Sequence, residues 1–239
     1  MSDEACGPGA PERSGEAEWE LERSDLVATL AHELRSPLTG MKGFVQAVLN
    51  RWDKLTDEQK KFMLTTALVD ADRLSRLITE MLDVARIDTG RLQMHRRPTE
   101  PEPIVRRVVD NIAISTSREI VLVAADALPS IDADPDKFAQ VVTNLADNAV
   151  RHGQGTVTIT LAAGEDQLLL TVDDEGDGIH PELRERVFTK YWKGGGSPGT
   201  GLGLYLVGGL VAAHGGTIAI DDRPGGGARL RVAWPAWHD

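Results

Sequence analysis

The sequence predicts a chain of two domains: an all-α antiparallel helical hairpin followed by an α/β sandwich. Up to about residue 90, apolar residues recur at steps of three and four, as they do along the buried face of a helix. Farther along, short stretches typical of strands alternate with helical stretches. Of the 24 glycines, 18 follow His152, which indicates sharp turns and close backbone approaches in the second half.

Length and composition allow two domains and argue against several classes of protein. A chain of 239 residues can bury two modest cores. The 26 basic and 37 acidic residues give a formal charge of −11, which argues against nucleic acid or an anionic membrane as the main partner. Cys6 is the one cysteine, so no internal disulfide can form and a reducing, cytoplasmic setting is predicted. Since no run of 18 apolar residues is present, no segment is predicted to span a membrane.

The hairpin is predicted over residues 18–90, after a disordered leader at 1–17. Its first apolar stripe runs along residues 18–50, and residues 52–55 interrupt it. Thr56 and Gln59 then form a capping-box pattern, which predicts the start of a second helix. The second stripe continues to Gly90, a residue type common at helix C-termini.

Two helices cannot bury two broad apolar stripes against each other alone. A second copy of the hairpin would complete a four-helix bundle, so we predict a homodimer. The alternative is a monomer in which the hairpin packs against the second domain.

Residues 91–102 are predicted to be a linker, because prolines at 98, 101 and 103 interrupt any helix there. The second domain is expected over residues 103–236, as a mixed sheet covered on one face by helices. Helices are expected at 103–115, 135–151, 181–187 and 201–214. Strands are expected at 120–124, 156–162, 167–173, 216–221 and 228–234.

Four motifs, in a fixed order, carry the chemistry. A histidine motif, His32–Pro37, lies on the first helix of the hairpin. The second domain then contains three motifs of a kind found at nucleotide sites: Asn144–Asn148, Asp174–Gly178 and Gly199–Leu204. Each is weak alone, but together they join a candidate phosphate acceptor and a candidate ATP site in one chain.

These motifs resemble the transmitter region of sensor histidine kinases, and the resemblance covers roughly residues 20–235. It implies a dimerisation and phosphoacceptor domain followed by an ATP-binding domain of the Bergerat (GHKL) type. It also implies that ATP, with Mg²⁺, donates a phosphoryl group to His32, which passes it to an aspartate of a response regulator in the cytoplasm. Because no sensor is visible, either an upstream sensor or membrane part is absent from this chain, or the protein senses through a partner.

His32 is placed about 200° around the helix from Leu30 and Leu34 and so faces away from the apolar stripe. That position alone would also fit an ordinary surface histidine. Pro37 favours a functional role, since a proline inside a helix costs about 3 kcal/mol unless local structure compensates. A neutral imidazole is also a good nucleophile near pH 7.

Two neighbours of His32 are candidates for supporting roles. Glu33 can hydrogen-bond the ring nitrogen that does not attack, and the family resemblance makes it the assisting acid. Ser36 lies on the same face one turn away. The family commonly has Thr or Asn there, a residue associated with positioning water for dephosphorylation of the partner, so a phosphatase role for Ser36 is a hypothesis.

Asp174 follows an apolar strand, and Gly176 and Gly178 let the backbone pass close to a flat ligand. The carboxylate can accept a hydrogen bond from the adenine amino group, where guanine would offer a carbonyl. A surface Asp/Gly turn is the alternative reading of the motif alone. In the kinase family these three residues form the adenine-binding motif.

Asn144 and Asn148 are expected on one face of a helix, one turn apart. Mg²⁺ prefers oxygen ligands, and a neutral amide oxygen can join them without repelling a triphosphate. The family resemblance assigns Asn148 to the metal and Asn144 to an auxiliary role. Arg151 and Lys137 are candidate phosphate contacts or, alternatively, solvated surface charges.

A glycine-rich segment precedes the helix predicted at 201–214: Gly199, Thr200, Gly201, Leu202 and Gly203. Exposed amide groups at a helix start form a phosphate cradle. The pattern is neither a Rossmann fingerprint nor a Walker loop. The stretch before it, residues 190–198, is expected to be a mobile lid.

Two other functional classes stay open at this point. One is an ATP-sensing scaffold or phosphatase in which His32 is idle, and the other is a GHKL serine kinase or ATPase. The sequence does not give the input signal, the identity of the response regulator, or whether phosphoryl transfer occurs within or between protomers.

Overall fold

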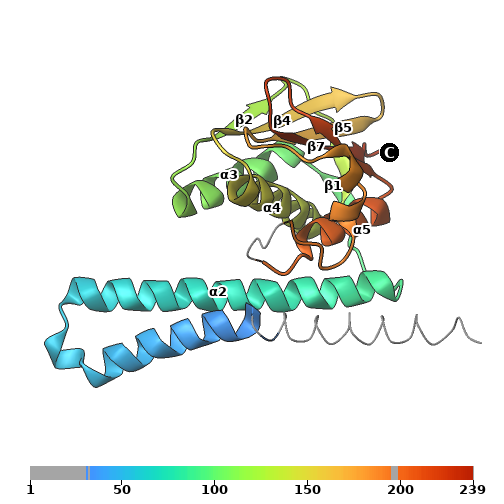
Figure 1. The fold of residues 1–239 in the computed structure, drawn as a ribbon. Coiled ribbons are helices and arrows are strands. Elements are labelled where there is room, and N and C mark those ends of the chain that lie inside the picture. Colours follow the sequence, from blue (N-terminus) through green and yellow to red (C-terminus); the bar gives the residue numbers. More distant parts are fainter. Residues whose placement is uncertain (1–30, 32, 195–198, 239) are drawn as a thin grey trace, which may run out of the picture. The chain divides into compact units, whose positions relative to one another are not determined.

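A computed structural model describes residues 31, 33–194 and 199–238 (Figure 1). The chain divides into two compact units, residues 1–77 and residues 78–239. The predicted leader, His32 and residues 195–198 of the predicted lid lie outside the described residues. The domain boundaries predicted at 90 and 103 stay predictions.

The first unit contains the predicted helical hairpin. One helix includes residues 33–50 and continues through Pro37 without interruption. A 3-10 turn, η1 (Trp52–Lys54), leads into α2 (Asp57–Asp88), whose residues from Ile78 onward belong to the second unit. Across the hairpin, an Arg73 guanidinium nitrogen lies 3.4 Å from a Glu33 carboxylate oxygen. The all-α hairpin is therefore confirmed.

Both ends of α2 have the local chemistry that the sequence predicted. Thr56 N–H donates to Gln59 Oε1 at 3.0 Å, and Gln59 N–H donates to Thr56 Oγ1 at 3.2 Å, which completes a capping box. At the other end, Gly90 has φ +63°, and Arg91 N–H donates to the Arg86 carbonyl at 2.8 Å. A left-handed glycine with such a bond is a common helix stop.

The hairpin leaves much of its apolar surface uncovered. Eight large apolar side chains of the first unit are each more than a third exposed: Leu38, Val45, Leu49, Trp52, Phe62, Leu64, Leu68 and Val69. A single soluble domain rarely exposes such a set without a partner.

The second unit is built on a five-stranded mixed sheet with helices on one face (Figure 1). The strand order is β2-β4-β5-β7-β6; β2 runs parallel to β4, and the other neighbours are antiparallel. The strands are β2 (Ile120–Ala124), β4 (Val157–Gly164), β5 (Gln167–Asp173), β6 (Thr217–Asp222) and β7 (Ala228–Pro235). The helices are α3 (Pro101–Ser115), α4 (Pro135–His152) and α5 (Gly203–Ala213).

The core lies between this sheet and its helices. Alternate residues of β4, β5 and β7 are buried, which is the period-2 pattern of a sheet with one covered face. Phe138 and Leu145 of α4 are fully buried, and Phe138 packs edge-on against Trp234 of β7 with ring centroids 5.0 Å apart. The predicted α/β sandwich is therefore confirmed.

Two details differ from the prediction. A small antiparallel pair, β1 (Arg97–Thr99) and β3 (Ile131–Ala133), was not expected. Each strand has only three residues, too few for an alternating pattern to stand out. The helix expected at 181–187 is two 3-10 turns, η2 (Pro181–Leu183) and η3 (Arg186–Phe188).

Candidate functional site

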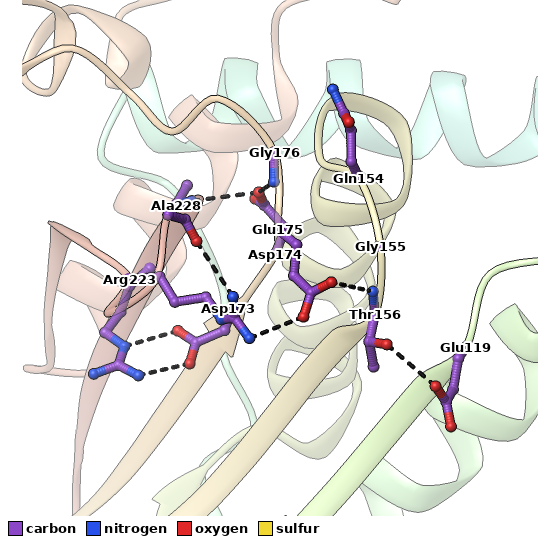
Figure 2. Close-up of polar contacts among 12 residues, drawn as sticks. Glu119, Gln154, Gly155, Thr156, Asp173, Asp174, Glu175, Gly176, Arg223 and Ala228 are labelled. Carbon is purple, nitrogen blue, oxygen red and sulfur yellow. Dashed lines mark hydrogen bonds and ion pairs between the residues drawn. The ribbon is translucent and has the colours of Figure 1, made fainter.

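Asp174 lies directly beyond the C-terminal end of β5 and is 5% exposed. Gly176 N–H donates to Asp174 Oδ1 at 2.8 Å, and Ala228 N–H donates to the same oxygen at 3.3 Å (Figure 2). Asp174 N–H in turn donates to the Ala228 carbonyl at 3.0 Å. Both hydrogen bonds that the described part of the chain donates to this carboxylate reach Oδ1. Oδ2 can therefore accept a hydrogen bond from a ligand.

Three glycines allow neighbouring loops to pack against Asp174. A Cβ at Gly153 would lie 2.6 Å from Asp174 Cγ, and a Cβ at Gly176 would lie 2.9 Å from Gly153 Cα. Gly227 has φ +103°, and a Cβ there would overlap the Asp174 carbonyl oxygen. The sequence analysis assigned Gly176 to the site but neither Gly153 nor Gly227. The run of three glycines at 225–227 was the sequence signal that could have indicated Gly227.

Glu175 ties together the loops on either side of this motif. Its N–H donates to the Gln154 carbonyl at 3.0 Å, and its Oε2 accepts from Thr156 N–H at 3.2 Å. Its Oε1 accepts from Arg223 at 2.9 Å (Figure 2). The edge of the site is therefore a network of backbone and carboxylate contacts among segments that lie far apart in the sequence.

Helix α4 carries Asn144 and Asn148 one turn apart, both half-buried. Asp134 caps its N-terminus by accepting from Asp136 N–H at 3.0 Å and Lys137 N–H at 3.3 Å. Burial alone would raise the pKa of Asp134, but hydrogen bonds from backbone N–H groups outweigh burial and lower it. The cap is therefore a charged carboxylate at neutral pH.

The segment Gly199–Gly203 lies at the start of α5, next to α4. Gly199 and Gly201 have φ +134° and +70°, a conformation that favours glycine. A Cβ at Gly199 would lie 3.6 Å from Arg151 Nη1, and a Cβ at Gly203 would lie 3.5 Å from Asn144 Oδ1. The structure thus brings Arg151 and Asn144 to the predicted phosphate cradle.

Thr200 and Leu202 hold the cradle in place. Thr200 is 7% exposed, and its Oγ1 accepts from Leu202 N–H at 3.2 Å. Leu202 is fully buried and its carbonyl accepts from Leu206 N–H at 2.8 Å, the first bond of α5. The buried side chains of Thr200 and Leu202 therefore fix the Gly199–Gly203 segment, and the backbone of the segment lies at the start of α5.

Other predicted residues have different surroundings. Lys137 Nζ lies 2.5 Å from Asp83 Oδ2 in the second unit. The ammonium group of Lys137, which the sequence made a candidate phosphate contact, is therefore paired with a carboxylate. His32 lies outside the described residues. Its neighbour Glu33 is half-buried and paired with Arg73, whereas Ser36 is exposed.

Among the described residues, no three His, Cys, Asp or Glu side chains gather in a way that would hold a metal ion.

His152, at the end of α4, has its pKa lowered first by burial and then by the charge of Arg151. The His152 imidazole is therefore largely neutral at pH 7.

Family models match both parts of the chain. The His Kinase A (phospho-acceptor) domain matches residues 22–90, and the histidine kinase-, DNA gyrase B- and HSP90-like ATPase domain matches residues 133–238. Together the two domains make up the transmitter region of two-component sensor histidine kinases, as the motifs predicted.

Known sensor histidine kinases are similar over most of this chain. Sensor protein SrrB of Staphylococcus aureus is 30% identical over 226 residues, which are 89% of this chain and 38% of SrrB. Sensor histidine kinase ZraS of Salmonella typhi is 33% identical over 216 residues, 88% of this chain and 45% of ZraS. The chain thus spans less than half the length of these relatives.

A solved structure, full-length ShkA in complex with AMPPNP, has a similar fold. It matches with a TM-score of 0.65 and 30% sequence identity, and the match covers 90% of this chain and 47% of ShkA. In the part of the chain that the structure describes, no helix combines the length and the apolar character needed to cross a membrane.

Proposed function

We propose that this chain is an ATP-dependent protein histidine kinase that phosphorylates its own His32 and passes the phosphoryl group to an aspartate of a response regulator. The observation that carries the proposal is the grouping of the three nucleotide motifs around α4. Asp174 packs against the loop that follows α4, while Arg151 and Asn144 of α4 lie beside the Gly199–Gly203 segment.

This grouping supports a defined pose for ATP. Asp174 Oδ2 would accept from the adenine amino group, since the two backbone donors hold Oδ1. The phosphates would meet the backbone amides at the start of α5 and the guanidinium of Arg151. The start of α5 and Arg151 would supply positive charge to the phosphates, and Asp174 would supply a hydrogen-bond acceptor to the adenine. This arrangement matches the polarity of ATP.

Mg²⁺ fits the donors present in this part of the site. Asn148 would be its protein ligand and Asn144 would support it, because neutral amide oxygens suit a cation that phosphate oxygens and waters also hold. When bound, Mg²⁺ supplies charge neutralisation to the phosphates. No cluster of carboxylates among the described residues competes for that role.

The chemical step would depend mainly on positioning. The neutral His32 imidazole would attack the γ-phosphorus while the bond from that phosphorus to the β,γ-bridging oxygen breaks and ADP leaves, and Glu33 would accept a hydrogen bond from the other ring nitrogen as positive charge develops there. Pairing with Arg73 at 3.4 Å supports Glu33 as a carboxylate held in a fixed orientation. Ser36 is exposed, which supports a role in holding water against a partner's phospho-aspartate.

A homodimer through the hairpin is part of the proposal. The uncovered apolar side chains of the first unit need a partner surface, and a second copy supplies a matching one by symmetry. The response regulator would then approach the exposed Ser36, on the helix face where the sequence predicts His32.

The test is incubation with Mg²⁺ and ATP labelled at the γ-phosphate. We expect the protein to take up label that is lost in acid and retained in base, as a phosphohistidine is. His32→Gln should abolish the labelling and leave ATP affinity, measured by calorimetry, within about twofold of wild type, because the residue belongs to a different domain. Acid-stable label, or equal labelling of the variant, would reject His32 as the acceptor.

A further inference from the structure

Arg118 lies between α3 and β2, outside every motif that the sequence singled out, and its side chain is half-buried. Its guanidinium makes five hydrogen bonds to four backbone carbonyls. Nη1 donates to the Ala149 carbonyl at 2.7 Å and to the Val150 carbonyl at 2.9 Å. Nε and Nη2 donate to the Gly155 carbonyl at 2.9 and 2.8 Å, and Nη2 also donates to the Gln154 carbonyl.

These carbonyls belong to two segments that the proposed ATP site needs. Ala149 and Val150 lie in the last turn of α4, where the helix dipole favours a cation, and the Ala149 carbonyl also accepts from Gly153 N–H at 3.0 Å. Gln154 and Gly155 form the loop after α4. One planar guanidinium therefore fixes the end of the asparagine-bearing helix to the loop that follows it.

The loop in turn contacts the adenine motif directly. The Gln154 carbonyl, which Arg118 holds, also accepts from Glu175 N–H at 3.0 Å. Gly153 packs so closely on Asp174 that any side chain there would overlap it. A shift of the loop would therefore move Asp174 relative to α4.

We propose that Arg118 is a positioning residue for adenine recognition: it sets the spacing between α4 and Asp174 without contacting the nucleotide. This role rests on the proposed ATP binding at Asp174. Only arginine suits the position, since a lysine has three donors on one atom and cannot reach both segments as a fork does.

The experiment compares Arg118→Gln and Arg118→Lys with wild type, using the full chain. Arg231→Gln is the matched control, because Arg231 lies on the same sheet and its ion pair, with Asp221 at 2.7 Å, does not involve the loop. Calorimetry would give the Kd and the fraction of active sites for a non-hydrolysable ATP analogue and for the matching inosine nucleotide. Thermal unfolding would be measured on the same samples.

A positioning role predicts weaker and less selective binding in the protein that remains folded. With several charge-assisted hydrogen bonds lost, we expect Arg118→Gln to raise the Kd for the ATP analogue about tenfold. The affinity ratio of the adenine to the inosine nucleotide should fall, since Asp174 moves from its acceptor position. Arg118→Lys should fall in between, and Arg231→Gln should match wild type.

Other outcomes would overturn the positioning role of Arg118. If the Arg118 variants only lower the fraction of active sites or the unfolding temperature, with Kd and selectivity unchanged, the residue is structural and the inference is overturned. Should Arg118→Gln fail to fold, Arg118→Lys decides the matter by the same criteria. Wild-type protein that binds no ATP analogue would reject the proposed function itself, and the inference with it.

Discussion

Replacing Asp174 by Asn should convert the proposed adenine acceptor into a hydrogen-bond donor. In the wild type, the N–H groups of Gly176 and Ala228 both donate to Oδ1 (Figure 2). The asparagine carbonyl oxygen must take that position to satisfy them, so the NH₂ group takes the place of Oδ2. The variant would then present N–H groups to the adenine amino group, which also has only hydrogens to offer there.

The size of the effect follows from this geometry. A hydrogen bond to a charged group contributes about 1.5–3 kcal/mol, so its loss should weaken ATP binding about 10- to 150-fold. Opposed donors place the expected value in the upper part of that range. An inosine nucleotide carries a carbonyl where adenine carries its amino group, so the variant should bind it no more weakly than wild type does.

Calorimetry with non-hydrolysable nucleotides would measure both affinities. Asp173→Asn is the control, because it makes the same charge change one residue away, at a carboxylate that pairs with Arg229 at 2.7 Å. Undiminished ATP affinity in Asp174→Asn would refute the reasoning, and so would an equal loss in Asp173→Asn. Unchanged selectivity between the two nucleotides would refute the predicted orientation of the amide.

Three further predictions concern other parts of the molecule. Gly227→Ala should lower both ATP affinity and unfolding temperature, whereas Gly225→Ala, which also has positive φ but open space around it, should cost only the backbone strain of about 1–2 kcal/mol; calorimetry and thermal melts would compare them. Burial lowers the pKa of His214 below its unfolded value near 6.5, so the free energy of unfolding should be flat above that pH. Below it the free energy should fall by up to about 1.4 kcal/mol per pH unit as the unfolded chain takes up the proton, and His214→Gln should reduce this slope in denaturant titrations. Ser36→Ala should slow dephosphorylation of the partner several-fold, by about 1 kcal/mol, without changing the rate of autophosphorylation; a matched fall in both rates would instead indicate that Ser36 only hydrogen-bonds its own helix.

The regular elements could be predicted from the sequence because their side chains carry the period of the element. α4 and β5, expected at 135–151 and 167–173, were found at 135–152 and 167–173. The capping pair Thr56 and Gln59 was also readable, since its two hydrogen bonds join residues three apart. Local chemistry of this kind is fully present in the sequence.

Parts of the site that depend on distant contacts could not be predicted. Arg118 has no motif around it, and its partners lie 31 to 37 positions away. Lys137 was a candidate phosphate contact because it lies on α4, but its ion pair with Asp83 spans 54 positions. The type of a residue gives the chemistry of its side chain. Its hydrogen-bond or ion-pair partner depends on how distant segments pack together, which no single segment of the sequence specifies.

The contact between Asp174 and Ala228 has a consequence for when the proposed nucleotide site is completed during synthesis of the chain. The two residues are 54 positions apart, so at 5–20 residues per second the ribosome adds Ala228 about 3–11 seconds after Asp174. During that interval the nascent chain contains the first two motifs and Asp174 and gains the Gly199–Leu204 motif, but it lacks the backbone groups of Ala228 that would orient the proposed adenine acceptor. An incomplete chain would therefore bind ATP weakly under the proposed function, and the pairing of β7 with β5 would complete the nucleotide site.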